Sequence, residues 1–171
     1  MPSCPERIRS RAESTRRKKD YRRAAEFFTT AMRCDPSWPG PVIARANAYR
    51  ALGKDGAALA DYRRAVVIEP RSPRPHNAVA WTLATSSEKK WRDGREAVKE
   101  ATIACSLSQW KDPSYINTLA AAFAESGDFP QAVRRAEEAL KIAAPEDKAS
   151  YTAHLVSFRA GKPWRETGMS R

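Results

Sequence analysis

NTLAAAFAESGDFPQAVRRAEEAL, residues 117–140, is the stretch that decides the fold. Small and apolar residues recur in it at helical spacing, stop at the Ser-Gly-Asp sequence, and then resume. Asp128, with Gln131 three residues later, has the form of a capping box that opens a helix, and Gly127 suits the turn that ends the preceding one. The stretch therefore predicts two helices joined by one tight turn.

The same pattern of residues recurs along the chain. Four positions return 34 residues later with the same character: Ala24, Phe28, Ala31 and Pro36 become Ala58, Tyr62, Ala65 and Pro70. The small-residue spacing returns twice more, as Ala97, Ala101 and Ala104 and as Ala132, Ala136 and Ala139. The step from the second set to the third is 39 residues, which indicates an insertion of about five residues within 86–94. Such a period is typical of stacked helix–turn–helix units, and no segment alternates as a strand would.

We therefore expect an all-α chain with four helix–turn–helix units and a C-terminal capping helix. The units are expected at about residues 5–36, 39–70, 73–109 and 113–144, and the capping helix at about 146–160. Residues 1–19 are too polar for an ordinary first helix, so we expect a basic arm or an irregular helix there. The repeat array then spans residues 20–162, and residues 163–171 form a tail.

The charge of the chain is concentrated at its N-terminus. The net charge is +11, and residues 1–23 contribute +6 of it, from three acidic and nine basic residues: Arg7, Arg9, Arg11, Arg16, Arg17, Lys18, Lys19, Arg22 and Arg23. Such a basic patch can attract nucleic acid, anionic lipid or an acidic partner, but composition alone favours a solvated helical face.

The sequence predicts a cytoplasmic protein. No apolar segment follows the N-terminal arginines as in a signal peptide, and no apolar run is long enough to cross a bilayer. The three cysteines, Cys4, Cys34 and Cys105, are widely scattered, and we expect them to be reduced thiols.

The repeated pattern resembles that of the tetratricopeptide repeat family. The 34-residue period, the alanine–aromatic–alanine–proline pattern and the small residue in each first helix (Ala46, Ala80 and Ala120) carry the resemblance over residues 39–144. It implies a right-handed α-solenoid. Residues 81–166 also resemble a C-terminal repeat module of multidomain bacterial proteins, some with Ser/Thr kinase domains, through WTLAT, RDGREAV, INTLAAAFAESGDF and RAGKPWRE.

Residue types that would indicate catalysis are sparse. His76 and His154 have no acidic or cysteine neighbour at ligand spacing, so we expect surface or groove residues and no metal site. The seven glycines are isolated, so no phosphate-binding loop is predicted. We expect no catalytic residue, no cofactor and no enzymatic activity.

The resemblance implies that the first helices line a concave groove that binds an extended peptide or a helix of a partner protein. The facing residues would be Ile43, Asn47, Arg50, Arg74, Asn77, Trp81, Asn117, Ala121 and Glu125. Asparagine amides can pair with a peptide backbone, arginines with a carboxylate, and Trp81 is either an apolar anchor or a core residue. Two alternatives stay open: nucleic-acid or acidic-surface binding through the basic patch, and a regulatory module of a larger enzyme such as a bacterial Ser/Thr kinase.

Overall fold

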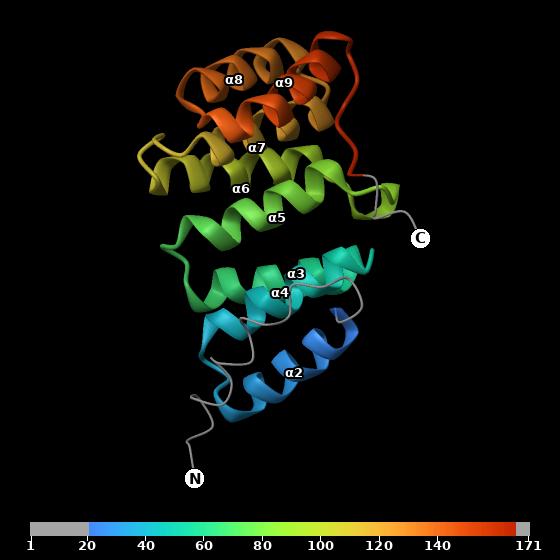
Figure 1. The fold of residues 1–171 in the computed structure, drawn as a ribbon, viewed down its shortest axis with the longest axis vertical. Helices are drawn as coiled ribbons and strands as arrows, with labels where there is room; N and C mark the ends of the chain where they lie inside the picture. Colours follow the sequence, from blue (N-terminus) through green and yellow to red (C-terminus); the bar gives the residue numbers. More distant parts are fainter. Residues whose placement is uncertain (1–20, 167–171) are drawn as a thin grey trace. The chain divides into compact units, whose positions relative to one another are not determined.

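The computed structural model describes residues 21–166, which form eight α-helices (α2–α9) and one short 3₁₀ helix, without a strand in this range (Figure 1). The predicted first helix and most of the basic patch lie outside the described residues. The described chain divides into two compact units, residues 21–70 and 71–166, which we treat separately. No helix within either unit is long and apolar enough to cross a membrane.

The first unit consists of three helices: α2 (Tyr21–Cys34), α3 (Pro39–Ala51) and α4 (Asp55–Ile68). Helix α3 packs against both α2 and α4. The small residues of the repeat pattern meet where the helices cross, and Ala46, Ala58 and Ala65 are fully buried. Side chains of this size let two helix backbones approach closely.

Arg45 links all three helices of the first unit. Its Nε and Nη2 atoms each donate to the Asp61 carboxylate on α4 at 2.7 Å, and its Nη1 donates to Thr29 Oγ1 on α2 at 3.0 Å. Asp61 is buried, and a buried charge must be paired to be tolerated. The hydrogen bonds to Asp61 raise the pKa of Arg45 further. The sequence pattern did not predict this contact.

The second unit consists of five α-helices and the 3₁₀ helix. These are α5 (Pro73–Thr85), η1 (Lys89–Trp91), α6 (Gly94–Leu107), α7 (Pro113–Ser126), α8 (Phe129–Ile142) and α9 (Pro145–Arg159). Each α-helix packs on the next, and α5 also packs on α7. The repeat alanines of α6 and α8 are fully buried between layers. Helix α9 lies beside α8 at the end of this stack (Figure 1).

The predicted capping box at Asp128 is partly confirmed, and the structure has a second aspartate cap at Asp93. The Asp93 and Asp128 side chains accept from the backbone N–H groups of Glu96 and Gln131, at 3.0 and 3.1 Å. Gly127 has a φ of 88°, as the turn requires. The capping box itself is incomplete, because Gln131 Oε1 is buried without a hydrogen-bond partner in the described chain. Helix α4 has no side-chain cap: it begins with Asp55, and Lys54 takes the N-cap position.

The insertion within 86–94 brings the chain into contact with the C-terminal end of α7. A Cβ atom on Gly94 would lie only 2.5 Å from Ser126 N and 2.8 Å from Glu125 C, so no larger residue fits there without movement of the backbone. This close approach brings the residues just before Gly94, Arg92 among them, next to Glu125. The insertion therefore supplies part of the site described next.

Candidate functional site

The predicted groove residues of the first unit occupy different environments on α3. Ile43 is buried in the helix packing, and so it contributes to the core rather than to an open surface. Asn47 is exposed, but its Oδ1 already accepts a hydrogen bond from the Tyr62 hydroxyl. Arg50 is half-buried near the end of the helix. Only part of the predicted surface is therefore open to a ligand in this unit.

The predicted residues on α5 lie along one side of the second unit. Arg74 is exposed at the start of the helix. Asn77 is half-buried, and its Oδ1 has no hydrogen-bond partner among the described residues. Trp81 is half-buried, and its Nε1 donates to the Glu166 carboxylate at 2.8 Å. The indole thus meets the C-terminal part of the same chain, 85 residues later.

Two of the three predicted residues on α7 are not accessible. Ala121 is buried in the packing of the helices. Asn117 is 3% exposed and bonds to His154 of α9, its Nδ2 lying 3.0 Å from the imidazole Nδ1. Asn117 was predicted to face a ligand, but the capping helix covers its side chain. Glu125 is the one predicted residue of α7 that meets a charged group on its surface.

The histidines also differ from expectation, because both are buried. His76 Nδ1 lies 2.6 Å from Glu100 Oε2. His154 is 5% exposed, and burial lowers its pKa from 6.5 to about 4. It is therefore neutral near pH 7, and its Nδ1 can accept from the Asn117 amide. Since each histidine makes a packing or polar contact inside the fold, the expectation of surface or groove histidines is wrong.

His154 is the centre of an aromatic cluster. Its ring centroid lies 4.4 Å from that of Trp164 in an edge-to-face arrangement, and 5.7 Å from that of Trp81. Tyr151 and Phe158, on its own helix, lie 6.3 and 6.4 Å away. Aromatic pairs at such distances stabilise a contact beyond the area they bury. The cluster joins α5, α9 and the residues that follow α9.

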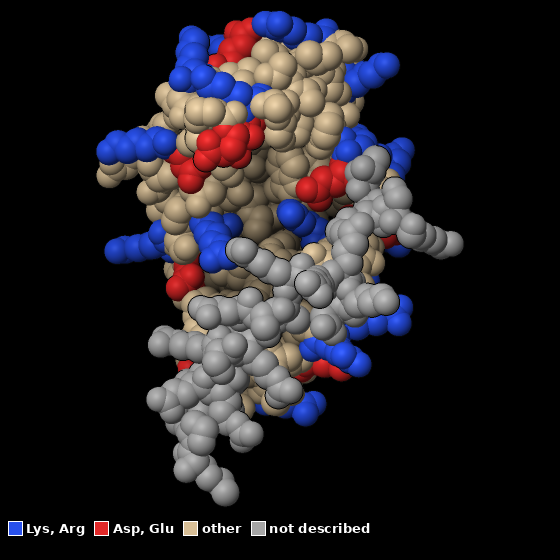
Figure 2. All heavy atoms as spheres, viewed as in Figure 1, with Lys and Arg blue, Asp and Glu red and all other residues tan. Residues whose placement is uncertain are grey.

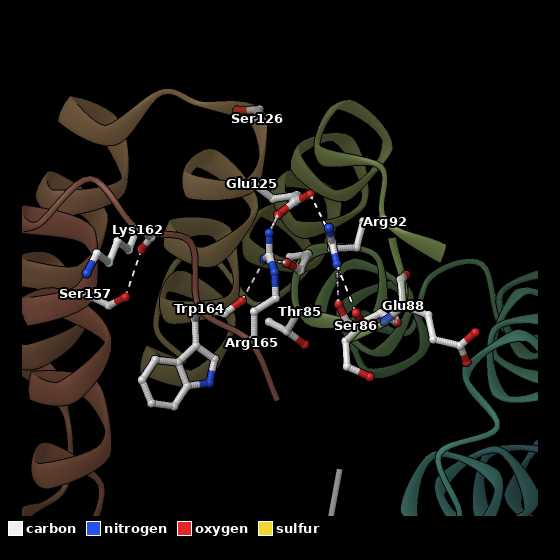
Figure 3. A network of polar contacts seen from close by, with 12 residues as sticks. Thr85, Ser86, Glu88, Arg92, Glu125, Ser126, Ser157, Lys162, Trp164 and Arg165 are labelled. Atoms are coloured by element: carbon white, nitrogen blue, oxygen red, sulfur yellow. Dashed lines mark hydrogen bonds and ion pairs between the residues drawn. The ribbon is translucent and has the colours of Figure 1, made fainter. Parts of the chain in front are cut away.

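The residues that follow α9 form neither helix nor strand and lie over the C-terminal ends of α5 and α7 (Figure 3). We call Pro163–Glu166 the C-terminal segment. The backbone N–H of Glu166 donates to Thr85 O at 3.0 Å, and Arg165 Nη1 donates to Ala84 O at 3.1 Å. A five-residue group receives this segment, which we call the docking face: Trp81, Ala84, Thr85, Glu125 and His154.

Helix termini explain why the segment lies here. The last four carbonyl groups of an α-helix have no partner within the helix, and its C-terminal end is electronegative. In α5, Thr82 O accepts from Ser86 N and Leu83 O from Asp93 N, both at 3.1 Å. The other two carbonyls, of Ala84 and Thr85, are those that the C-terminal segment satisfies. The end of α5 thus offers two acceptors that favour a cation and a backbone N–H group.

Glu125 lies between two arginines at the same place. Its Oε1 accepts from Arg92 Nε at 3.1 Å, and its Oε2 lies 2.5 Å from Arg165 Nη2 (Figure 3). The second contact is an ion pair by distance without the angles of a hydrogen bond. Arg92 also donates to the carbonyls of Ser86 and Ser87. The sequence pattern predicted the insertion but not the contact of Arg92 with Glu125, because only the fold brings these two residues together.

Within the described chain no three His, Cys, Asp or Glu side chains are placed to hold a metal ion. Cys105 is a free, fully buried thiol whose pKa burial raises to about 12, so it is not a nucleophile at neutral pH. The expectation of reduced thiols is confirmed at Cys105, and Cys4 lies outside the described residues.

The basic patch falls mostly outside the described residues, and only Arg22 and Arg23 are placed, both exposed on α2. On the face of the second unit seen in Figure 2, Lys and Arg are interspersed with Asp and Glu rather than gathered in one basic surface.

Comparison with known proteins supports the repeat pattern. A model of the tetratricopeptide repeat family matches residues 4–154. The structure of MamA 41-end from Desulfovibrio magneticus RS-1 is similar, with a TM-score of 0.76 and 14% identity, over 94% of this chain and 86% of that one. A crystal structure of MamA protein gives a TM-score of 0.73 and 14% identity, over 94% and 84% of the two chains. Another, titled "Crystal structure of MamA", gives 0.66 and 12% identity, over 88% and 93%.

At these identities the structural likeness concerns the fold alone, and it is to an all-α repeat solenoid of stacked helix pairs. No curated protein sequence matches the chain. The repeat period, the buried alanines at its small positions and the match over most of the sequence agree with one another. Folds of this kind present interaction surfaces to protein partners. The chain belongs to the tetratricopeptide repeat family.

Proposed function

We propose that the chain is a non-catalytic scaffold that binds an extended peptide of a partner protein at the docking face. The observation that carries this proposal is the C-terminal segment itself, a non-helical stretch of polypeptide whose backbone and side chains bond to the ends of α5 and α7. A peptide from another protein can make the same kinds of contact: a backbone N–H and a cation on the helix-end carbonyls, and a charged group on Glu125.

The polar groups of the docking face favour an extended ligand over a helical one. Thr85 O accepts from the backbone of Glu166, and a helical ligand has its own N–H groups occupied except in its first turn. Recognition through backbone groups and a few side chains is how extended peptides are commonly bound. We therefore narrow the expected ligand to an extended segment.

We include no catalysis in the proposal, because the groups that would perform it are engaged elsewhere. His154 packs among aromatic rings and bonds to Asn117, His76 lies against Glu100, and the Cys105 thiol is buried. A partner protein is the expected ligand.

Selection from a displayed library of random peptides tests the proposal without presupposing a ligand sequence. Peptides enriched on the full chain should lose binding to Glu125→Lys and keep it with Glu137→Lys. The control exchanges Glu137 of α8, which is also ion-paired with an arginine, since its Oε1 lies 2.7 Å from Arg159 Nη2 of α9. Enrichment of no peptide, or of peptides that bind both variants equally, would refute the proposed site.

A further inference from the structure

The C-terminal segment presents three successive side chains, and each meets a different part of the docking face. The Trp164 ring packs against His154, Arg165 pairs with Glu125 and the end of α5, and the Glu166 carboxylate accepts from Trp81 Nε1. The segment thus offers an aromatic ring, a guanidinium and a carboxylate in this order. They contact an imidazole, a carboxylate and an indole N–H of the docking face. This order defines the chemistry of a ligand that fits the face.

We propose that Pro163–Glu166 is a tethered occupant of the docking face, which a partner peptide must displace by presenting the same aromatic–arginine–acid chemistry. The inference rests on the proposed function and adds to it the class of ligand and a built-in competitor. The segment is a good competitor because tethering gives it an effective concentration in the millimolar range.

The fold does not require the segment in order to hold α9. Tyr151, Leu155 and Phe158 are buried and anchor that helix by themselves. The cap of α9 ends at Lys162, whose N–H donates to Ser157 O at 3.0 Å and whose carbonyl accepts from the Ser157 hydroxyl at 2.9 Å. Residues 163–166, which follow this cap, are half-buried. Departure of the segment from Pro163 onward thus leaves the helix and its cap intact.

The docking face also keeps a balanced charge when the segment leaves. Glu125 has two arginine partners, and Arg92 belongs to the insertion before α6 rather than to the segment. When Arg165 leaves, the Glu125 carboxylate keeps Arg92 as a partner, and so the cost of an unpaired buried charge does not arise. The carbonyls of Ala84 and Thr85 lose their donors, and an incoming peptide with an arginine and a free N–H group replaces them.

The size of the competition follows from the tether. If the segment itself binds the face with an intrinsic dissociation constant of about 0.1 mM, its effective concentration of about 1–10 mM makes a free peptide bind the wild type roughly 10- to 100-fold more weakly than it binds a chain without a competing segment. A peptide and the segment compete for the same face. A substitution that abolishes binding of the segment therefore raises the affinity of the peptide by this factor.

The test measures binding of a fluorescent peptide, GKPWRE with an amidated C-terminus, by anisotropy to three full-length chains. These are the wild type, Trp164→Ala/Arg165→Ala, and the matched control Trp110→Ala/Arg159→Ala. In the control, the tryptophan stacks on Arg135 and the arginine pairs with Glu137, both outside the docking face. We expect the segment variant to bind at least about 10-fold more tightly than the wild type and the control.

A further Glu125→Gln exchange in the segment variant should weaken that binding again. Equal affinity of wild type and segment variant overturns the tethered occupant, as does a peptide that binds neither chain. A dimeric wild type in light scattering, with a monomeric segment variant, also overturns it, because the segment would then be exchanged between copies. The library selection described above stays informative in each case, so failure here is distinct from failure of the proposed function.

Discussion

His154 should make the stability of the second unit depend on pH. Burial lowers its pKa from 6.5 to about 4, so the unfolded chain binds a proton that the folded one does not over this interval. Stability conferred by the neutral imidazole is complete above pH 6.5 and is lost as the pH falls towards 4. For these two values, the linkage relation gives a loss of about 2 kcal/mol in the free energy of unfolding between pH 7 and pH 5.

The matched variant is His154→Phe, which keeps an aromatic ring among Trp81, Trp164 and Phe158 but cannot titrate. At pH 7 the variant should be the less stable chain by about 1–3 kcal/mol, because the buried Asn117 amide loses its partner. Between pH 7 and pH 5 the wild type should then lose about 2 kcal/mol more than the variant does.

Urea unfolding followed by tryptophan fluorescence and circular dichroism at half-unit steps of pH measures both curves. The difference between them isolates His154 from the carboxylates, which titrate in both chains. Parallel curves between pH 7 and pH 5 would show that the imidazole is not held neutral by its surroundings, and the argument from burial would be refuted.

Three further predictions concern packing and reactivity. Gly94→Ala should lower the free energy of unfolding by about 1–3 kcal/mol, because its Cβ would lie 2.5 Å from Ser126 N; a variant as stable as the wild type would contradict the close approach. Arg45→Met should destabilise the first unit by about 3–5 kcal/mol in chemical unfolding, since it leaves Asp61 buried and unpaired, whereas a loss below about 1 kcal/mol would mean that water reaches the carboxylate. Cys105 should resist iodoacetamide at pH 8 in the folded chain and react after unfolding, as mass spectrometry of its peptide can show; rapid labelling of the native protein would disprove its burial.

Much of the fold was accessible from residue spacing. The alanines that recur in the sequence are the residues with least exposed surface, because a small side chain is what lets neighbouring helices approach. Every unit needs small residues at the helix crossing, and so alanines recur in the sequence with the period of the repeat. The turn at Gly127 and the cap at Asp128 are likewise local, since each depends on residues within one turn of the helix.

The candidate site was less accessible because it depends on contacts without a period. Trp81 meets Glu166, and Asn117 meets His154, across 85 and 37 residues of sequence. The family resemblance indicated the helices of the groove but gave no sign that the chain covers part of them itself. The closing RAGKPWRE sequence contributed to the resemblance, yet no pattern in it predicted that Arg165 would reach the end of α5.

The end of α5 has a consequence for synthesis of the protein. Two carbonyls of its last turn find their donors in residues 165 and 166, the side-chain bond spanning 81 residues. At ~5–20 residues per second, a ribosome needs roughly 4–16 s to add that stretch. During this time the last turn of the emerging helix can fray, and its completion awaits translation of residues 165 and 166. Stop codons introduced just before codon 163 should therefore yield nascent chains in which this turn never closes.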